Sequence, residues 1–167
     1  MLNGLKFGRI KRMEQELKPK VTLVFGRICS GKSHYRANDV VEKIYVSNIV
    51  RSIIESSDRD KLQNTMHLDD QIASKILQQV ELVQSSSEII IDGIRQVSIV
   101  EKVLEIYPNA ELIWLEVPIE ERKRRYDNRG ASKDVESFEV ADNKPIELEC
   151  QRIFQIFKDN ITIINNY

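Results

Sequence analysis

VTLVFGRICSGKSHY, which spans Val21 to Tyr35, combines an apolar run with a glycine-containing motif, and the rest of the chain can be interpreted from it. Its first five residues are β-branched, aromatic or otherwise apolar, as expected for a strand buried on both faces of a sheet. The next eight residues, Gly26 to Ser33, match G-x-x-x-x-G-K-[ST] at every fixed position. A buried strand that leads into this motif predicts a loop that binds the phosphates of a nucleoside triphosphate.

The spacing of this motif has a chemical basis. Gly26 and Gly31 let the backbone curl so that successive N–H groups face one anion, and a following helix would add the positive end of its dipole. We expect Lys32 to reach the β and γ phosphates of ATP, and Ser33 to place its hydroxyl on a Mg²⁺ ion that bridges them. The other residues predicted to bind this cofactor are Cys29, Ser30 and His34.

Length and composition indicate one soluble globular domain. The chain has 167 residues, of which 41% are hydrophobic and 31% are charged, and this is enough for a single core. Because 25 lysines and arginines oppose 26 acidic residues, net charge gives no argument for a nucleic-acid or membrane partner. No apolar run approaches the roughly 20 residues that cross a bilayer, and the N-terminus lacks the hydrophobic core of a secretory signal.

The two cysteines, Cys29 and Cys150, indicate a reducing compartment. They lie far apart and fit neither a paired metal motif nor a disulfide framework. At Cys29 a small side chain that fills the loop is favoured over a thiol whose pKa is lowered by the start of a helix. We expect a cytoplasmic protein that is a monomer or a homodimer and has no membrane partner.

The chain before the first strand is basic. Residues 1–20 carry six lysines and arginines and form a predicted N-terminal extension. A solvated tail or short helix is favoured there over an arm that binds nucleic acid. Residues 21–167 are predicted to form one domain with a short lid at about 119–137.

Hydrophobic periodicity predicts alternating strands and helices after the phosphate loop. Further strands are expected at 44–46, 89–91, 111–117 and 161–164. Helices are expected at 32–43, at 49–54 with Ser47-Asn48 as a cap, at 69–84, 97–106 and 120–128, and at 138–158 with an interruption near Pro145. Apolar strands separated by helices predict an α/β fold, a three-layer sandwich in which a five-stranded parallel sheet is covered on both faces.

Polar residues at the carboxyl ends of the strands are candidates for a substrate site, because ligands of such sheets bind beyond those ends. Asp92 ends the third predicted strand and is expected to help hold Mg²⁺, with a helix N-cap as the alternative. Arg95 lies three residues further on. Ser47 and Arg51 lie at the corresponding end of the second strand. These four residues are predicted to line the substrate site.

A cluster of basic residues follows the fourth predicted strand. Arg125 and Arg129 are i,i+4 neighbours on one helix face, and planar guanidinium groups suit a phosphoryl group whose charge spreads over several oxygens. A mobile basic lid would bring them to such a group. For Arg122 and Lys123 we expect instead a solvated helix face, balanced by nearby glutamates.

Several segments together resemble the phosphate-loop nucleoside monophosphate kinase superfamily. They are Gly26–Ser33, Val46–Arg51, Ile91–Arg95, and Arg125–Arg129 followed by Asp134 and Phe138-Glu139. The chain is most similar to the small adenylate-kinase-like and dephospho-coenzyme A kinase-like members, including those of archaea and phages. The resemblance covers about residues 21–166.

The resemblance implies roles for two pairs of arginines. Arg51 and Arg95 would hold the phosphate of the acceptor, and Arg125 and Arg129 would contact the phosphates of the donor. The chain also departs from the family pattern. Ser47-Asn48 stands where many relatives have Gly-Asp, a single Ile94 replaces the usual Phe-Pro, and the short predicted lid lacks cysteines spaced for zinc.

The residues and the resemblance together predict an ATP- and Mg²⁺-dependent kinase. Its acceptor is expected to be a small phosphorylated molecule, with a nucleoside or deoxynucleoside monophosphate favoured. The predicted catalytic residues are Lys32, Arg95, Arg125 and Arg129. The alternatives are a kinase of dephospho-coenzyme A or of nucleic-acid 5′ ends, nucleic acid being the less favoured partner, and a non-enzymatic nucleotide-binding switch.

Overall fold

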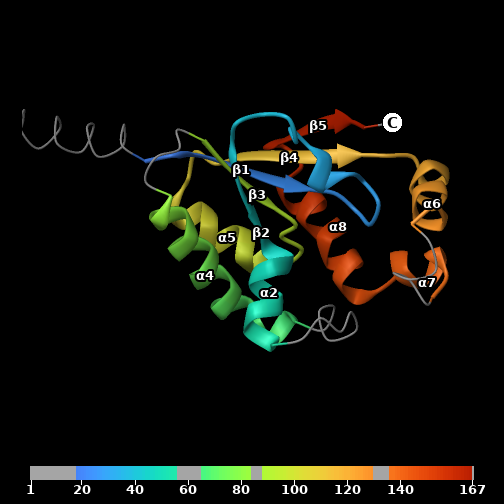
Figure 1. The fold of residues 1–167 in the computed structure, drawn as a ribbon, viewed down its shortest axis with the longest axis horizontal. Helices are drawn as coiled ribbons and strands as arrows, with labels where there is room; N and C mark the ends of the chain where they lie inside the picture. Colours follow the sequence, from blue (N-terminus) through green and yellow to red (C-terminus); the bar gives the residue numbers. More distant parts are fainter. Residues whose placement is uncertain (1–17, 56–64, 84–87, 130–135, 167) are drawn as a thin grey trace, which may run out of the picture.

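The fold is built on a parallel sheet of five strands in the order β2-β3-β1-β4-β5. A computed structural model describes residues 18–55, 65–83, 88–129 and 136–166. Neighbouring strands pair in parallel throughout this sheet, with Val24 of β1 opposite Asp92 of β3 and Phe25 of β1 opposite Trp114 of β4. The predicted α/β fold with a five-stranded parallel sheet is confirmed (Figure 1).

The elements alternate along the chain as strands and helices. The strands are β1 Lys20–Phe25, β2 Glu42–Tyr45, β3 Glu88–Asp92, β4 Glu111–Glu116 and β5 Ile161–Asn165. The α-helices are α2 Val46–Ile54, α4 Asp69–Leu82, α5 Val97–Ile106, α6 Ile119–Asp127, α7 Phe138–Asp142 and α8 Pro145–Phe157. Two short 3₁₀ turns, η1 Lys32–His34 and η2 Met66–Leu68, complete the described elements.

The larger core lies between one face of the sheet and a layer of helices. Alternate residues of β1, namely Val21, Leu23 and Phe25, point into this core and are each at most 2% exposed. Helices α2, α4, α5 and α8 supply the other side of it (Figure 1). Apolar residues at helical spacing, such as Ile72 and Ile76 of α4, form the inward stripe of each helix.

The opposite face of the sheet carries a smaller core. Val24, Ile90, Ile113 and Leu115 are buried there, and the partly buried residues packed against them are Tyr35, Val41 and Ile164. The connection between β1 and β2 therefore covers this face and forms the third layer.

The helix predicted over 32–43 is wrong. The chain makes only the 3₁₀ turn Lys32–His34 and then a series of turns before β2. Arg36 adopts a left-handed conformation with φ 49°, which a continuous helix does not contain, and its side chain pairs with Asp39 at 2.5 Å and with Glu88 at 2.8 Å. The phosphate loop therefore receives no dipole from a following α-helix.

The boundary between β2 and α2 also differs from the prediction. Val46, expected to end the strand, is the first residue of α2, so Ser47 and Asn48 lie in its first turn instead of capping it. Tyr45 is the N-cap residue and makes no side-chain capping bond. By contrast, the predicted interruption near Pro145 is confirmed, because Pro145 opens α8 at a position where its missing N–H costs nothing.

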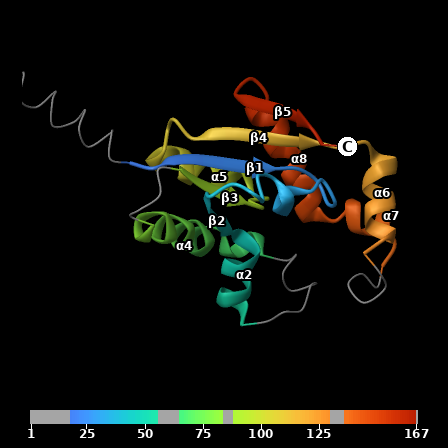
Figure 2. The same ribbon diagram turned by 45° about the horizontal axis from the view of Figure 1, so that its top comes forward.

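The carboxyl ends of the strands meet at one edge of the sheet. In both views α6 and α7 lie beyond the ends of β1 and β4 at this edge (Figure 2). At the opposite end of β1, Nζ of Lys18 lies 5.5 Å from the ring centre of Tyr107. The rest of the predicted extension, residues 1–17, and residues 130–135 of the predicted lid lie outside the described part.

Among the helices of the described ranges, none combines the length and apolarity that crossing a bilayer requires.

Candidate active site

A cavity of about 680 Å³ lies at the carboxyl edge of the sheet. It is formed by the phosphate loop, the ends of β2 and β3, the start of α2, the end of α6 and the residue after β5. The residues that line it are Ile28, Cys29, Gly31, Lys32, Ser33, His34, Tyr45, Ser47, Arg51, Asp92, Gly93, Arg95, Arg125, Arg129 and Asn166. Most residues that the sequence singled out thus face one space. Gly26 and Ser30 are the exceptions, because both are buried within the loop and do not line the cavity.

The phosphate loop needs a glycine where it turns towards η1. Gly31 has φ 85°, and a Cβ at this position would lie 2.6 Å from Nδ2 of Asn166. Cys29 also adopts a positive φ, of 63°, and its buried side chain packs in a small cluster with Ile28, Tyr126 and Phe138. That packing agrees with the favoured interpretation of Cys29 as a small filler.

The Lys32 amine is turned back onto the phosphate loop. Its Nζ donates to the carbonyl oxygens of Gly26 at 2.5 Å and Arg27 at 3.0 Å, and to Oγ of Ser30 at 3.3 Å. Burial, with a smaller contribution from the positive charge of Arg95, lowers the pKa of Lys32 to about 8. A bound polyphosphate would favour the charged amine and compete with these carbonyl oxygens.

Ser33 and Asp92 fit a magnesium site. The Ser33 residue is exposed, Asp92 is 7% exposed, and both line the cavity. Burial raises the pKa of the Asp92 carboxyl, while Lys32, Lys43 and Arg95 oppose the rise. Mg²⁺ in proteins is commonly held by one or two carboxylates together with substrate phosphates and water, and this donor set matches that pattern.

The alternative role of Asp92 as a helix cap is wrong, because α5 begins five residues later and Gln96 is its N-cap residue.

The candidate substrate residues come from helix α2 and from the connection between β3 and α5. Ser47 and Arg51 lie in the first and second turns of α2, and both are exposed. Nη1 of Arg51 donates to Oδ1 of Asn48 at 3.1 Å. Arg95 lies between β3 and α5, and its guanidinium forms an ion pair with the buried carboxylate of Glu147. Arg51 of α2 and Arg95 of the β3–α5 connection therefore line the same cavity.

Arg125 bridges α6, the phosphate loop and the residue after β5. Its Nε donates to Glu121 at 2.7 Å, its Nη1 to the Cys29 carbonyl at 3.4 Å and its Nη2 to the Asn166 carbonyl at 2.8 Å. Hydrogen bonds from Arg124 and then Arg125 lower the pKa of the partly buried Glu121 to about 2. Arg129 lies one turn further along, lines the same cavity and is exposed.

Asn166 is a cavity residue that the sequence analysis missed. Its Nδ2 donates to the Ser30 carbonyl at 2.7 Å, and its backbone N–H donates to the Glu116 carbonyl at 3.0 Å. Asn166 therefore fastens the chain after β5 to the phosphate loop. A parallel strand that ends at the same edge was the available signal, because its carboxyl end must lie beside those of the other strands.

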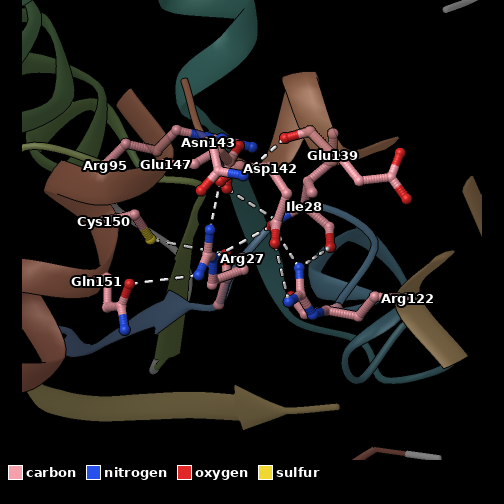
Figure 3. A network of polar contacts seen from close by, with 12 residues as sticks. Arg27, Ile28, Arg95, Arg122, Glu139, Asp142, Asn143, Glu147, Cys150 and Gln151 are labelled. Atoms are coloured by element: carbon pink, nitrogen blue, oxygen red, sulfur yellow. Dashed lines mark hydrogen bonds and ion pairs between the residues drawn. The ribbon is translucent and has the colours of Figure 1, made fainter. Parts of the chain in front are cut away.

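The prediction of a solvated Arg122 is wrong. This side chain is buried, and its guanidinium binds the Asp142 carboxylate through two contacts of 2.5 and 3.2 Å. Asp142 also pairs with Nε of Arg27, a phosphate-loop residue, at 3.2 Å. Figure 3 shows both guanidinium groups directed at this one carboxylate. For Lys123 the prediction is confirmed, because it is exposed and pairs with exposed Glu139.

Comparison of the sequence with models of protein families and with curated proteins finds no match. Solved structures do match the fold. A chain of the Pnkp1/Rnl/Hen1 RNA repair complex aligns with a TM-score of 0.59 at 18% identity, over 83% of this chain and 46% of that one. The protein TT1252 from Thermus thermophilus aligns with a TM-score of 0.55 at 16% identity, over 89% of both chains. A sugar kinase from Janibacter sp. aligns with a TM-score of 0.46 at 14% identity, over 88% of this chain and 85% of that one.

These similarities concern the fold. The chain spans less than half the length of the matched chain of the RNA repair complex. Sequence identities of 18% and below support a shared fold and carry no information about the roles of individual side chains. The chain thus shares its fold with the matched chain of the RNA repair complex and with TT1252.

Proposed function

We propose that the chain is an ATP- and Mg²⁺-dependent phosphotransferase that moves the γ-phosphoryl group to a small phosphorylated acceptor. A nucleoside or deoxynucleoside monophosphate is the favoured acceptor. The observation that carries the proposal is the shared cavity, in which Lys32 of the phosphate loop lies together with Arg51, Arg95, Arg125 and Arg129. Five cationic side chains around one space suit two bound phosphate chains and the charge shared between them.

The donor side is formed by the phosphate loop and α6. The loop amides and Lys32 bind the β and γ phosphates, and Arg125 approaches them from the loop side because it already contacts the Cys29 carbonyl. Arg129 belongs to the predicted lid, about residues 119–137 of a domain formed by 21–167, and closes over the reacting phosphate. Closure excludes water, so the acceptor competes better with hydrolysis.

The acceptor side is formed by α2 and the β3–α5 connection. Arg51 and Arg95 clamp the acceptor phosphate, and Ser47 donates a further hydrogen bond to it. Ser33 and Asp92 hold Mg²⁺, which when bound neutralises charge on the transferred phosphoryl group. No protein nucleophile is required, because the acceptor oxygen attacks directly and the role of the chain is to align it.

A second candidate acceptor is the 5′ end of a nucleic acid. Two observations support it over a switch without enzymatic activity, and only the second separates it from dephospho-coenzyme A, whose acceptor group is also a hydroxyl. A buried carboxylate, Asp92, whose pKa is raised, lies in the cavity and suits a hydroxyl acceptor that must lose a proton. A fold neighbour also belongs to an RNA repair complex.

A coupled assay of ADP formation over a panel of acceptors tests the proposal. The panel contains nucleoside and deoxynucleoside monophosphates, dephospho-coenzyme A, and oligonucleotides with a 5′-hydroxyl. We expect turnover with at least one monophosphate and its loss in Lys32→Ala. Lys102→Ala, which changes an α5 lysine that does not line the cavity, is the matched control and should keep full activity.

The acceptor role is tested separately. Arg95→Ala and Arg51→Ala should each raise the KM for the acceptor while ATP affinity is kept, and Arg152→Ala, at a largely exposed position of α8, should change neither. Turnover that persists in Lys32→Ala contradicts the proposed donor site. Turnover with oligonucleotides alone would replace the favoured acceptor by the second candidate.

A further inference from the structure

Glu147 is a buried carboxylate that joins two sides of the cavity. It lies in the first turn of α8 and is 1% exposed. One carboxylate oxygen, Oε2, accepts the backbone N–H of Ile28 in the phosphate loop at 2.9 Å. The other, Oε1, forms an ion pair with Nη1 of Arg95 (Figure 3).

A carboxylate buried to this degree is costly to charge unless partners compensate for lost water. Glu147 has three such partners: the loop amide, the Arg95 guanidinium, and the positive end of the α8 dipole at its first turn. The other buried residues of α8 are Ile146, Glu149, Cys150 and Ile153, so most of the inward face of this helix is apolar. The contacts with Ile28 and Arg95 therefore offset the burial of the Glu147 charge.

Arg95 is held by Glu147 and also lines the cavity. A guanidinium has five N–H donors in a rigid plane, so a carboxylate that engages one of them fixes the direction of the rest. The Arg95 side chain is 27% exposed and is one of the cavity residues. It is also near enough to Lys32 for its charge to contribute to the lowered pKa of that lysine. Glu147 thus fixes a guanidinium at the place where donor and acceptor would meet.

We propose that Glu147 is a positioning residue for phosphoryl transfer: it orients Arg95 towards the acceptor phosphate and fixes that arginine relative to the phosphate loop. This inference rests on the proposed function. Glu147 touches no substrate and acts through Arg95 and the Ile28 amide. Its effect is therefore on acceptor use, with donor binding kept.

The decisive variant is Glu147→Gln, which keeps the shape and an oxygen for the Ile28 N–H but removes the charge that holds Arg95. We expect kcat/KM for the acceptor to fall by about 10- to 100-fold, as for a misplaced binding group, with the KM for ATP within about twofold of wild type. Glu149→Gln is the matched control. Glu149 is a buried carboxylate of the same helix, but it accepts from Val97 and pairs with Arg152.

A double-mutant cycle separates positioning from a general structural effect. If Glu147 acts through Arg95, then Glu147→Gln should add little to Arg95→Lys, because the group that it orients is already changed. Additive losses in the double variant would overturn the inference. Equal losses in Glu147→Gln and Glu149→Gln, or a parallel rise of the KM for ATP, would overturn it as well.

Nuclear magnetic resonance of ¹⁵N-arginine-labelled wild-type protein gives a measurement that needs neither a stable Glu147 variant nor an acceptor. The side-chain N–H signals of Arg95, assigned by their loss in Arg95→Lys, should exchange with water much more slowly than those of exposed Arg129. Equally fast exchange would show that Arg95 is not held, and the inference would fail. If instead Arg95 is held but wild type transfers phosphate to no acceptor, then the proposed function fails, and with it the role in transfer.

Discussion

Arg122 of α6 and Asp142 of α7 form a buried ion pair with contacts of 2.5 and 3.2 Å, and the same carboxylate also binds Arg27 of the phosphate loop. One acidic residue therefore fastens the helix that carries Arg125 and leads to Arg129 to the loop that would hold the donor. The face of the Phe138 ring completes this contact, since the Arg122 guanidinium lies 5.3 Å from its centre.

Asp142→Ala is expected to destabilise the fold by about 3–5 kcal/mol, because it leaves two arginines without their shared buried partner. Arg122→Ala should cost less, since Asp142 then keeps Arg27. Denaturant unfolding measures both. Lys123→Ala, which breaks the exposed pair with Glu139 one position along, is the control and should stay within about 1 kcal/mol of wild type. Equal effects of Asp142→Ala and Lys123→Ala would contradict the buried pair.

Donor affinity should fall as pH rises through about 8, the pKa of Lys32. The folded pKa lies below the ordinary 10.5, so above pH 8 the free protein carries a neutral amine. A polyphosphate binds the charged amine, and binding must then take up a proton. Calorimetric titration with a Mg²⁺-bound ATP analogue should show affinity falling by up to about tenfold per pH unit between 8 and 10.

Lys32→Arg supplies the control for this pH dependence, because a guanidinium stays charged over that range. Its affinity, whatever its absolute value, should not fall between pH 8 and 10. An affinity of the wild-type chain that is constant over this range would show that Lys32 keeps its ordinary pKa or does not contact the donor.

Gly31→Ala should weaken ATP binding by at least about tenfold. The substitution forces alanine into φ 85° at a cost of roughly 1–2 kcal/mol, and its Cβ would meet the Asn166 amide at 2.6 Å. Gly93→Ala separates the two effects, because Gly93 has φ 92° but no atom within 4 Å of the added carbon. The glycine variants are compared by binding of the ATP analogue. A weaker effect at Gly31 than at Gly93 would contradict the loop conformation.

Asn166→Ala should lower ATP affinity by about 2- to 10-fold, which corresponds to the loss of one hydrogen bond, that from Nδ2 to the Ser30 carbonyl. Arg125 keeps its bond to the backbone oxygen of residue 166, so the loop should loosen without losing its arginine. Asn165→Ala, at an exposed position in β5, is the control. Identical ATP affinities of Asn166→Ala and Asn165→Ala would show that Asn166 does not contribute to donor binding.

The strands and the phosphate loop were predictable because their signals are local. Apolar runs of the length of β1 and β3 suit buried parallel strands, and the motif fixes the loop that follows β1. Because the strands are parallel, their carboxyl ends lie at one edge of the sheet, and this places Asp92 and Arg51 near the same edge. The segment after the loop was mispredicted because a helix was assumed from the motif. Its own residues, with Asn38-Asp39 before Val40-Val41, favour a turn.

The carboxylates that organise the site were not predictable from local pattern. Glu147 contacts the Ile28 amide across 119 positions of sequence, and Asp142 pairs with an arginine in another helix. The spacing of Glu147 and of Arg122, the partner of Asp142, gives a weak sequence signal that these charged residues are buried. Glu147 lies three residues before buried Cys150 on one face of α8, and Arg122 lies four before buried Tyr126 on α6. A charge on an apolar helix face requires a buried partner, but sequence alone does not say which one.

Phosphorus nuclear magnetic resonance of a mixture of ATP, Mg²⁺ and the best acceptor monophosphate tests the central claim most directly. We expect the wild-type chain to convert ATP to ADP while a new diphosphate signal of the acceptor grows in equal amount, and Lys32→Ala to produce neither change. Release of inorganic phosphate without a phosphorylated acceptor, or unchanged ATP in the presence of every acceptor of the panel, would contradict it.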